Sequence, residues 1–158
     1  MDTNKQVLRQ KFRQIRLAMS REEVEDKSKR ICQRLLSEVD LEIIENLLVY
    51  KPIKKLNEIE LGYFVTQLKA KQPLIKIDVI QPRPAQPPKA KYDLIIVPLL
   101  AFDKNNQRLG RGGGWYDKFL ATQPQATKIG VGFQNGFVEQ NLPHESHDMR
   151  LDKVITEI

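Results

Sequence analysis

The sequence predicts an α/β fold in a single domain, residues 1–158, in which a mostly parallel open sheet of about five or more strands is flanked by helices. Five short runs are rich in Val, Ile and Leu, as strands of a covered sheet are. Helical patterns alternate with these runs, which is typical of parallel strands joined by crossover helices. The length of 158 residues suits one domain with a sizeable core.

The first third of the chain predicts two helices and a strand. Residues 4–19 place apolar side chains at spacings of four, three and four, namely Leu8, Phe12, Ile15 and Met19. Ser20 and Glu23 form an S-x-x-E capping box, which ends the first helix and starts a second that reaches about Asp40. A strand follows at Leu47–Tyr50.

Asn57 offers an N-cap for a third helix that runs to about Lys71, with Glu58 in its first turn. Glu58 has two interpretations. It either complements the helix dipole, or it faces a ligand beyond the end of a strand, where parallel α/β sheets bind ligands. A strand is expected at Ile75–Ile80.

Residues 81–91 (QPRPAQPPKAK) contain four prolines and predict an extended surface connector. The apolar run that starts at Leu94 and ends at Pro98 predicts a central strand covered on both faces. Further strands are expected at Lys128–Phe133, where glycines suggest close backbone approach, and at Lys153–Thr156.

Residues 94–120 are the most informative stretch, because a glycine-rich turn follows the central strand. Gly110, Gly112, Gly113 and Gly114 lie beside Arg108 and Arg111. Such a turn lets backbone N–H groups approach an anion, and the arginines add forked donors suited to phosphate. Trp115, Tyr116 and Asp117 follow, so aromatic rings and a carboxylate stand next to the turn. The spacing matches neither the P-loop nor the dinucleotide fingerprint, and a plain βα turn is the alternative.

A basic stripe on the first helix also has two interpretations. Lys5, Arg9, Arg13 and Arg16 lie beside the apolar face, and such stripes are usually solvated. The alternative is that they border a cleft and bind a polyphosphate.

Composition bounds the class of protein. The formal net charge of +6 suits nucleic acid or small anionic ligands, but no RNA-binding or zinc-finger pattern accompanies it. There is no apolar run long enough to span a membrane, no signal-peptide pattern, and a single cysteine, Cys32, in a helical apolar pattern. We therefore expect a cytoplasmic protein.

His144 and His147 do not have the H-E-x-x-H spacing, so a solvated loop is expected there rather than a zinc site.

Taken together, these motifs resemble the 5-formyltetrahydrofolate cyclo-ligase family. LIIVPLLAFDKNNQRLGRGGGWYDKFL is similar to the family's P-x-x-A-F-D-x-x-x-x-R-L-G-x-G-x-G-Y-Y-D signature, and LPHESHDMRLDKVITE to its closing L-P-x-E-x-H-D-x-x-x-D-x-V-I-T-E. KQVLRQKFRQIRLAMS resembles the family's opening, and YKPIKKLNEIEL more weakly resembles the segment with its acidic residue. Trp115 replaces the usual Tyr, and residues 81–91 are shorter than the corresponding family segment.

The resemblance implies ATP- and Mg²⁺-dependent closure of 5-formyltetrahydrofolate to 5,10-methenyltetrahydrofolate, with release of ADP and phosphate. The expected partner is thus a small molecule, without membrane or nucleic acid, and the expected state is a monomer. A nucleotide- or RNA-binding relative without catalysis is the alternative. A sugar-phosphate enzyme of similar α/β build ranks last, because it rests on fold analogy alone.

The resemblance also implies roles for residues. Asp117 and Asp152 match the Mg²⁺ positions. Glu58 matches the folate-contacting glutamate, with Ile53 as an apolar contact, and Tyr116 is expected at the formyl end. Arg111 and Tyr116 are the expected catalytic residues. The ATP contacts are expected from Lys5, Arg9, Arg108, Gly110, Arg111, Gly112, Gly113, Gly114, Trp115 and Tyr116.

Overall fold

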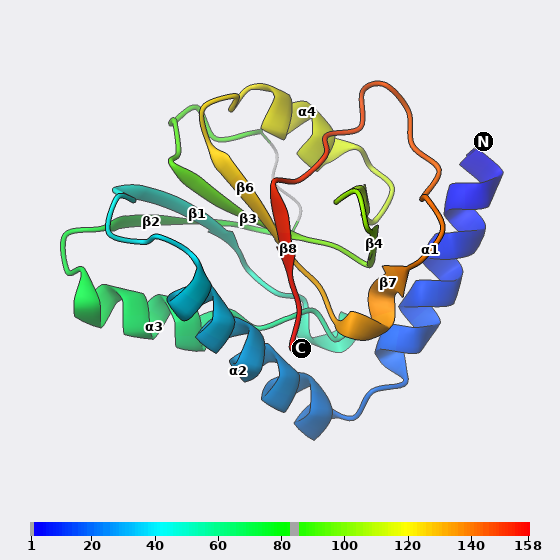
Figure 1. Cartoon of the computed structure of the whole chain (residues 1–158), viewed down its shortest axis with the longest axis horizontal. Coiled ribbons are helices and arrows are strands. Elements are labelled where there is room, and N and C mark those ends of the chain that lie inside the picture. Colours follow the sequence, from blue (N-terminus) through cyan, green and yellow to red (C-terminus); the bar gives the residue numbers. More distant parts are fainter. Residues whose placement is uncertain (1, 83–85) are drawn as a thin grey trace.

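The computed structural model describes residues 2–82 and 86–158 as a single α/β domain (Figure 1). The helices are α1 (Asp2–Leu17), α2 (Arg21–Glu38), α3 (Gly62–Lys71) and α4 (Trp115–Ala121), with 3₁₀ turns η1 (Lys54–Leu56) and η2 (Gln134–Gly136). The strands are β1 (Asn46–Tyr50), β2 (Lys76–Ile80), β3 (Leu94–Pro98), β4 (Ala101–Asp103), β5 (Arg108–Leu109), β6 (Thr127–Val131), β7 (Phe137–Val138) and β8 (Lys153–Ile155).

Five strands form a fully parallel sheet in the order β2-β1-β3-β6-β8. The predicted fold class is therefore confirmed, and β3 is the central strand, as its apolar run predicted. The chain passes from β1 outward to β2, then returns to the other side of β1 at β3. This reversal of direction makes a crevice at the carboxyl ends of β1 and β3, where ligands bind in open α/β sheets.

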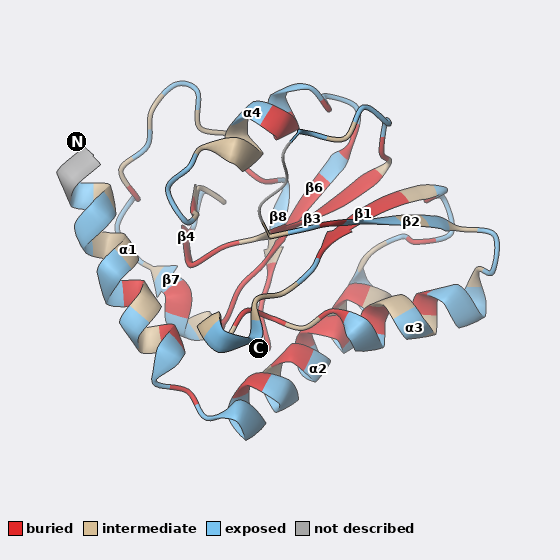
Figure 2. Ribbon diagram, turned by 180° about the vertical axis from the view of Figure 1, so that it is seen from behind, coloured by how far each residue is buried: buried red, intermediate tan, exposed pale blue. Residues whose placement is uncertain are grey.

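Alternate side chains of each inner strand enter separate cores on the two faces of the sheet. Leu47 and Val49 of β1 pack with α2 and α3, whereas Leu48 lies on the opposite face with Phe119 and Leu120 of α4. This follows from the two-residue period of a strand. Figure 2 shows the buried sheet between these helices, whose outer faces are exposed.

The loop predicted after β3 contains a small second sheet. β4 pairs with β5 in antiparallel orientation and with β7 in parallel orientation. Phe12 of α1 packs against this sheet with Leu100, Ala101 and Leu109. Strands of two or three residues are too short to show the alternating apolar pattern that predicts a strand, so they could not be predicted.

The second helix begins as predicted. Ser20 is its N-cap, and the Ser20 hydroxyl accepts the Glu23 N–H at 3.1 Å. Cys32 of this helix is fully buried and acts as a small core side chain, as expected. Among the described residues no helix is both long and apolar enough to cross a membrane.

The predicted start of the third helix is wrong. Asn57 does not cap a helix. It follows η1 in the left-handed conformation (φ 55°), and α3 begins only at Gly62. Glu58 consequently lies in a loop and not in a first helical turn. The Asn57 amide instead donates to the carbonyls of Arg16 and Met19, at 2.9 and 3.0 Å, and these tertiary contacts decide its conformation.

The glycines of β6 and the loop after it permit the close approach that the sequence suggested. A Cβ on Gly130 would lie 2.8 Å from Leu99 Cδ2, and one on Gly132 would lie 2.5 Å from Leu99 Cδ1. The connector after β2 is irregular and largely exposed where it is described, and its residues 83–85 lie outside the described residues.

Candidate active site

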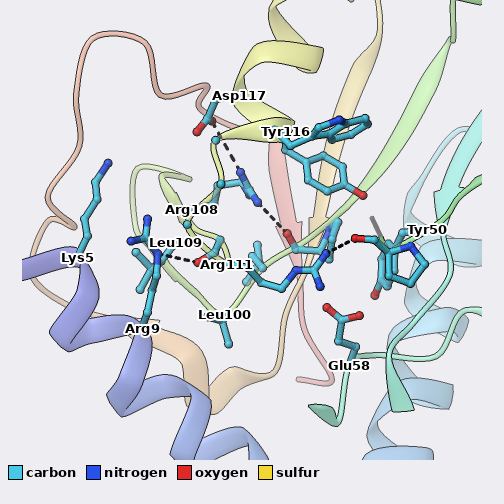
Figure 3. Close-up of a pocket in the computed structure, with 18 of the residues that line it drawn as sticks. Lys5, Arg9, Tyr50, Glu58, Leu100, Arg108, Leu109, Arg111, Tyr116 and Asp117 are labelled. Atoms are coloured by element: carbon cyan, nitrogen blue, oxygen red, sulfur yellow. Dashed lines mark hydrogen bonds and ion pairs between the residues drawn. The ribbon is translucent and has the colours of Figure 1, made fainter. Parts of the chain in front are cut away.

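A cavity of about 880 Å³ opens beyond the carboxyl ends of the first three strands of the sheet (Figure 3). Tyr50, Ile80 and Pro98, the last residues of β1, β2 and β3, all line it. Seven basic and four acidic side chains share the lining. The volume lies near the upper end for ligand pockets, and the basic excess suits an anionic ligand.

The basic stripe of α1 faces this cavity and is not a solvated flank. Lys5, Arg9, Arg13 and Arg16 all line the cavity, because residues three and four apart share one helix face. Arg9 Nε donates to the Gly110 carbonyl at 3.0 Å and so joins the helix to the glycine-rich turn.

Lys5 is tied to the loop before β8. Its Nζ lies 2.6 Å from Asp148 Oδ2 and 3.8 Å from Glu145 Oε1. Burial alone would raise the pKa of Asp148, but the hydrogen bonds from Lys5 and from the Glu145 N–H hold it below its ordinary value. Asp148 is therefore ionised at neutral pH and pairs with the Lys5 ammonium.

The glycine-rich turn forms the wall opposite α1. Gly112 and Gly114 have positive φ angles of 115° and 67°, which side-chain-bearing residues rarely adopt. A Cβ on Gly113 or Gly114 would meet no atom within 4 Å, so the backbone of this turn is open to a ligand. Arg111 projects from the turn, and its Nη2 donates to the Pro82 carbonyl at 2.8 Å across the cavity.

The two arginines of the turn are placed differently. The Arg108 side chain is only 8% exposed. Its Nη2 donates to the Pro98 carbonyl at 3.3 Å, and its Nη1 lies 3.7 Å from Asp117 Oδ1. The guanidinium also lies 5.3 Å from the centre of the Tyr116 ring. Burial lowers the pKa of Arg108, and the Asp117 carboxylate opposes that effect. Arg108 is buried in the cavity wall, whereas the Arg111 side chain reaches across the cavity.

Tyr116 and Trp115 begin α4 and line the cavity side by side, with ring centres 5.0 Å apart. Burial raises the pKa of Tyr116, and Arg108 partly opposes this. The hydroxyl is therefore protonated at neutral pH and can donate a hydrogen bond. Trp115 stacks on Phe119 at 5.2 Å, which fixes its ring as a wall.

The opposite end of the cavity carries a single carboxylate. Glu58 is 5% exposed, and its Oε1 accepts the Ile53 N–H at 2.7 Å. Tyr50 lies next to it with its hydroxyl bonded to the Ile59 carbonyl at 2.9 Å. Leu56 and Ile80 add apolar surface. This end suits a flat ring that donates hydrogen bonds, in contrast to the basic end.

Comparison with known proteins decides the family. Residues 76–157, more than half of the chain, match the model of the 5-formyltetrahydrofolate cyclo-ligase family. The chain belongs to the 5-formyltetrahydrofolate cyclo-ligase family. The resemblance noted in the sequence is thereby confirmed.

A 5-formyltetrahydrofolate cyclo-ligase from Mycoplasma pneumoniae is 29% identical over 167 aligned positions, which cover 98% of this chain and 99% of that protein. A mouse protein of the same name is 41% identical over 70 residues, 41% of this chain and 34% of the mouse protein. The solved structure of a 5,10-methenyltetrahydrofolate synthetase from Mycoplasma pneumoniae has a TM-score of 0.81 at 24% identity, over 98% of this chain and 99% of that one. The structural likeness supports the fold.

The structure brings most of the residues implied by the cyclo-ligase resemblance into one cavity. The lining includes Lys5, Arg9, Glu58, Arg108, Trp115, Tyr116, Asp117 and all of residues 110–114. Ile53 is not among the lining residues, and its backbone N–H orients Glu58 instead. The sequence reading missed Tyr50, Ile80 and Pro98. They could have been found, because each ends a predicted parallel strand.

Asp152 also lies outside the lining of this cyclo-ligase cavity. It is exposed, and its Oδ2 accepts the Lys128 N–H at 2.8 Å at the start of the β6–β8 pairing. Glu145 and Asp148, which the sequence placed in a solvated loop, line the cavity instead. No cluster of three or more potential metal ligands occurs in residues 2–82 and 86–158.

Asp117 fits a magnesium ion held jointly with phosphates. It lines the cavity beside the glycine-rich turn, and its Oδ1 accepts the Met149 N–H at 3.0 Å, which fixes the carboxylate. Mg²⁺ is usually held by one or two carboxylates, substrate phosphates and water, so a single oriented aspartate is a sufficient protein ligand set.

Proposed function

We propose that the protein catalyses the ATP-dependent closure of 5-formyltetrahydrofolate to 5,10-methenyltetrahydrofolate, with release of ADP and phosphate. The observation that carries the proposal is the two-ended cavity. A glycine-rich turn with basic side chains lies at one end and the buried Glu58 carboxylate at the other. Membership of the cyclo-ligase family supports the same reaction.

The reaction needs two successive displacements. The formyl oxygen attacks the γ-phosphorus of ATP, and the bond from that phosphorus to the ADP oxygen breaks. The formyl carbon then carries a phosphate as its leaving group. N10 attacks that carbon, the carbon–oxygen bond to phosphate breaks, and N10 loses its proton to solvent. Phosphoryl transfer of this kind depends on positioning and charge neutralisation more than on a reactive side chain.

The basic end would hold ATP. The backbone of the glycine-rich turn and the side chains of Lys5 and Arg9 would bind the phosphates, since they face the same part of the cavity. Lys5 would exchange its contact with Asp148 for a phosphate oxygen. Trp115 would wall the nucleotide. We assign Arg108 a positioning role for Asp117 and Tyr116, because it is buried against both of them.

The middle of the cavity would hold the reacting groups. Arg111 would stabilise negative charge on the transferred phosphate, because it reaches across the cavity between the two ends. The protonated Tyr116 hydroxyl would orient the formyl oxygen. Asp117 would hold Mg²⁺, which neutralises phosphate charge when bound. We assign the metal to Asp117 and not to Asp152, whose carboxylate lies outside the cavity.

The Glu58 end would hold the pterin ring. Its free oxygen would accept hydrogen bonds from the ring's amino and ring N–H groups, and Leu56 and Ile80 would pack on the ring faces. A ring without such donors would leave the buried Glu58 carboxylate without hydrogen bonds, which costs free energy. Glu58 would therefore also select for rings that carry these N–H groups.

The test is to mix the protein with 5-formyltetrahydrofolate and Mg·ATP and to follow the absorbance band of the methenyl product. ADP release equal to product is expected. A protein that binds Mg·ATP but forms no product at high enzyme concentration contradicts the proposal. Oligonucleotide binding with steep salt dependence, in place of turnover, would favour the RNA-binding alternative.

A further inference from the structure

Helix α1 is joined to the Glu58 loop by reciprocal hydrogen bonds at its C-terminal end. Arg16 Nε donates to the Leu56 carbonyl at 2.8 Å. In return, Asn57 Nδ2 donates to the carbonyls of Arg16 and Met19, at 2.9 and 3.0 Å. The two carbonyls lie in the last turn of α1 and just beyond its end at Leu17, and that of Arg16 also accepts the Met19 N–H at 3.2 Å.

The backbone conformation of Asn57 sets the direction of the chain between the 3₁₀ turn η1 and Glu58. Its left-handed conformation (φ 55°, ψ 34°) ends η1, and the chain then places Glu58 in the cavity lining. Asparagine adopts this conformation more readily than other side-chain-bearing residues. The Glu58 carboxylate is then fixed from within the loop by the Ile53 N–H.

Arg16 adds charge to the same junction. It is 7% exposed, lines the cavity, and takes part in none of the ion pairs formed among the described residues. Burial lowers the pKa of Arg16, and the charge of Glu58 opposes that effect. No salt bridge joins Arg16 to Glu58, so the hydrogen bond from Arg16 to the Leu56 carbonyl is the direct link of its side chain to the Glu58 loop.

We propose that Arg16 and Asn57 are positioning residues for the substrate end of the cavity, which fix the Glu58 carboxylate by tying its loop to the end of α1. The inference rests on the proposed function, because it assumes that Glu58 contacts the folate ring. Lys5 and Arg9 lie near the other end of the same helix, so α1 sets the separation between the phosphate-binding and ring-binding groups.

The decisive variant is Asn57→Gly. Glycine keeps the left-handed conformation without strain but removes both side-chain hydrogen bonds, to the carbonyls of Arg16 and Met19. The KM for 5-formyltetrahydrofolate should rise roughly five- to thirtyfold, on the scale of one or two lost hydrogen bonds, while the KM for ATP changes less than about twofold. In a Glu58→Gln background the same substitution should change the folate KM much less, because its effect passes through Glu58.

Asn106→Gly is a matched control. Asn106 is also left-handed (φ 62°), and its amide also donates to a backbone carbonyl, that of Asp152, at 3.3 Å, but it lies outside the cavity lining. It should lower thermal stability without changing either KM. If Asn57→Gly does not fold, Arg16→Lys decides. Lysine keeps the charge and loses the fixed Nε donor, so the folate KM alone should rise severalfold.

The outcomes separate the two proposals. A wild-type protein that forms no methenyl product contradicts the proposed function. An active wild type whose Asn57→Gly and Arg16→Lys variants lower only the melting temperature, or raise both KM values equally, overturns the positioning role. A change in the folate KM that is the same in the Glu58→Gln background overturns it as well.

Discussion

Substitution of Gly114 by alanine tests whether the glycine-rich turn has the conformation described. Gly114 has φ 67° and ψ 9°, and a Cβ there would meet no atom within 4 Å. The cost is therefore purely conformational, about 1–2 kcal/mol for a left-handed alanine. Residue 114 immediately precedes α4, whose Phe119 and Leu120 are fully buried, so the turn cannot relax without moving that helix.

The melting temperature of Gly114→Ala should fall by about 2–8 °C, because each kcal/mol of lost stability lowers the melting temperature of a domain of this size by about 2–4 °C. Gly113→Ala is the matched control. It is equally free of contacts but has no positive φ, so its melting temperature should change by less than about 2 °C. Gly114→Asn should recover part of the loss, because asparagine tolerates this conformation. Equal melting temperatures for the two alanine variants would refute the reasoning.

Three further predictions concern the cavity. Asp117→Asn should abolish most turnover and its Mg²⁺ dependence while the melting temperature stays within a few degrees, as measured by product absorbance and thermal unfolding. Glu58→Gln should lower kcat/KM for 5-formyltetrahydrofolate roughly ten- to hundredfold, on the scale of one charged hydrogen bond, with the KM for ATP little changed. The pKa of Asp148 is held below its ordinary value, so its ion pair with Lys5 stabilises the fold above the unfolded pKa of about 4 and is lost as pH falls through the folded value.

Each of these has a contrary outcome. Unchanged turnover in Asp117→Asn would remove that residue from the metal role. A Glu58→Gln variant with equal losses for both substrates would place the carboxylate away from the folate ring. For the ion pair, the stability difference between wild type and Asp148→Asn should be present at pH 7 and should shrink progressively as the pH falls below about 4. A difference that is constant across this range would show that the pair contributes nothing through its charge.

Local patterns predicted the sheet because each inner strand is a run of apolar side chains that must be covered on both faces. The run from Leu94 to Pro98 is the central strand, and Ser20 is the N-cap of α2, as expected. The glycine-rich turn was also visible in the sequence, because left-handed backbone at Gly112 and Gly114 requires a particular residue type. The small sheet of β4, β5 and β7 could not be seen in the sequence, because its strands are too short to show an alternation of apolar and polar residues.

The tertiary structure decided the placement of the polar residues. Asn57 is a residue type favoured at a helix N-cap, yet it caps no helix, and its side-chain amide donates to the carbonyls of Arg16 and Met19, about forty residues away in the chain. Arg108 and Arg111 look equivalent in sequence, but tertiary packing buries the Arg108 side chain in the cavity wall and sends that of Arg111 across the cavity. Asp117 and Asp152 both lie in motifs that match the cyclo-ligase family. Only the fold shows that Asp117 lines the cavity, whereas the Asp152 carboxylate accepts the Lys128 N–H of β6 outside it.

The sequence by itself therefore determined the fold class, the family motifs and the chemical character of the phosphate end, because these depend on local conformation and on residue type. The tertiary structure alone decided which charges converge. A hydrogen bond or ion pair depends on atoms within a few ångströms, and that proximity arises from strands and helices far apart in the chain. The pairing of α1 with both the glycine-rich turn and the Glu58 loop is of this kind.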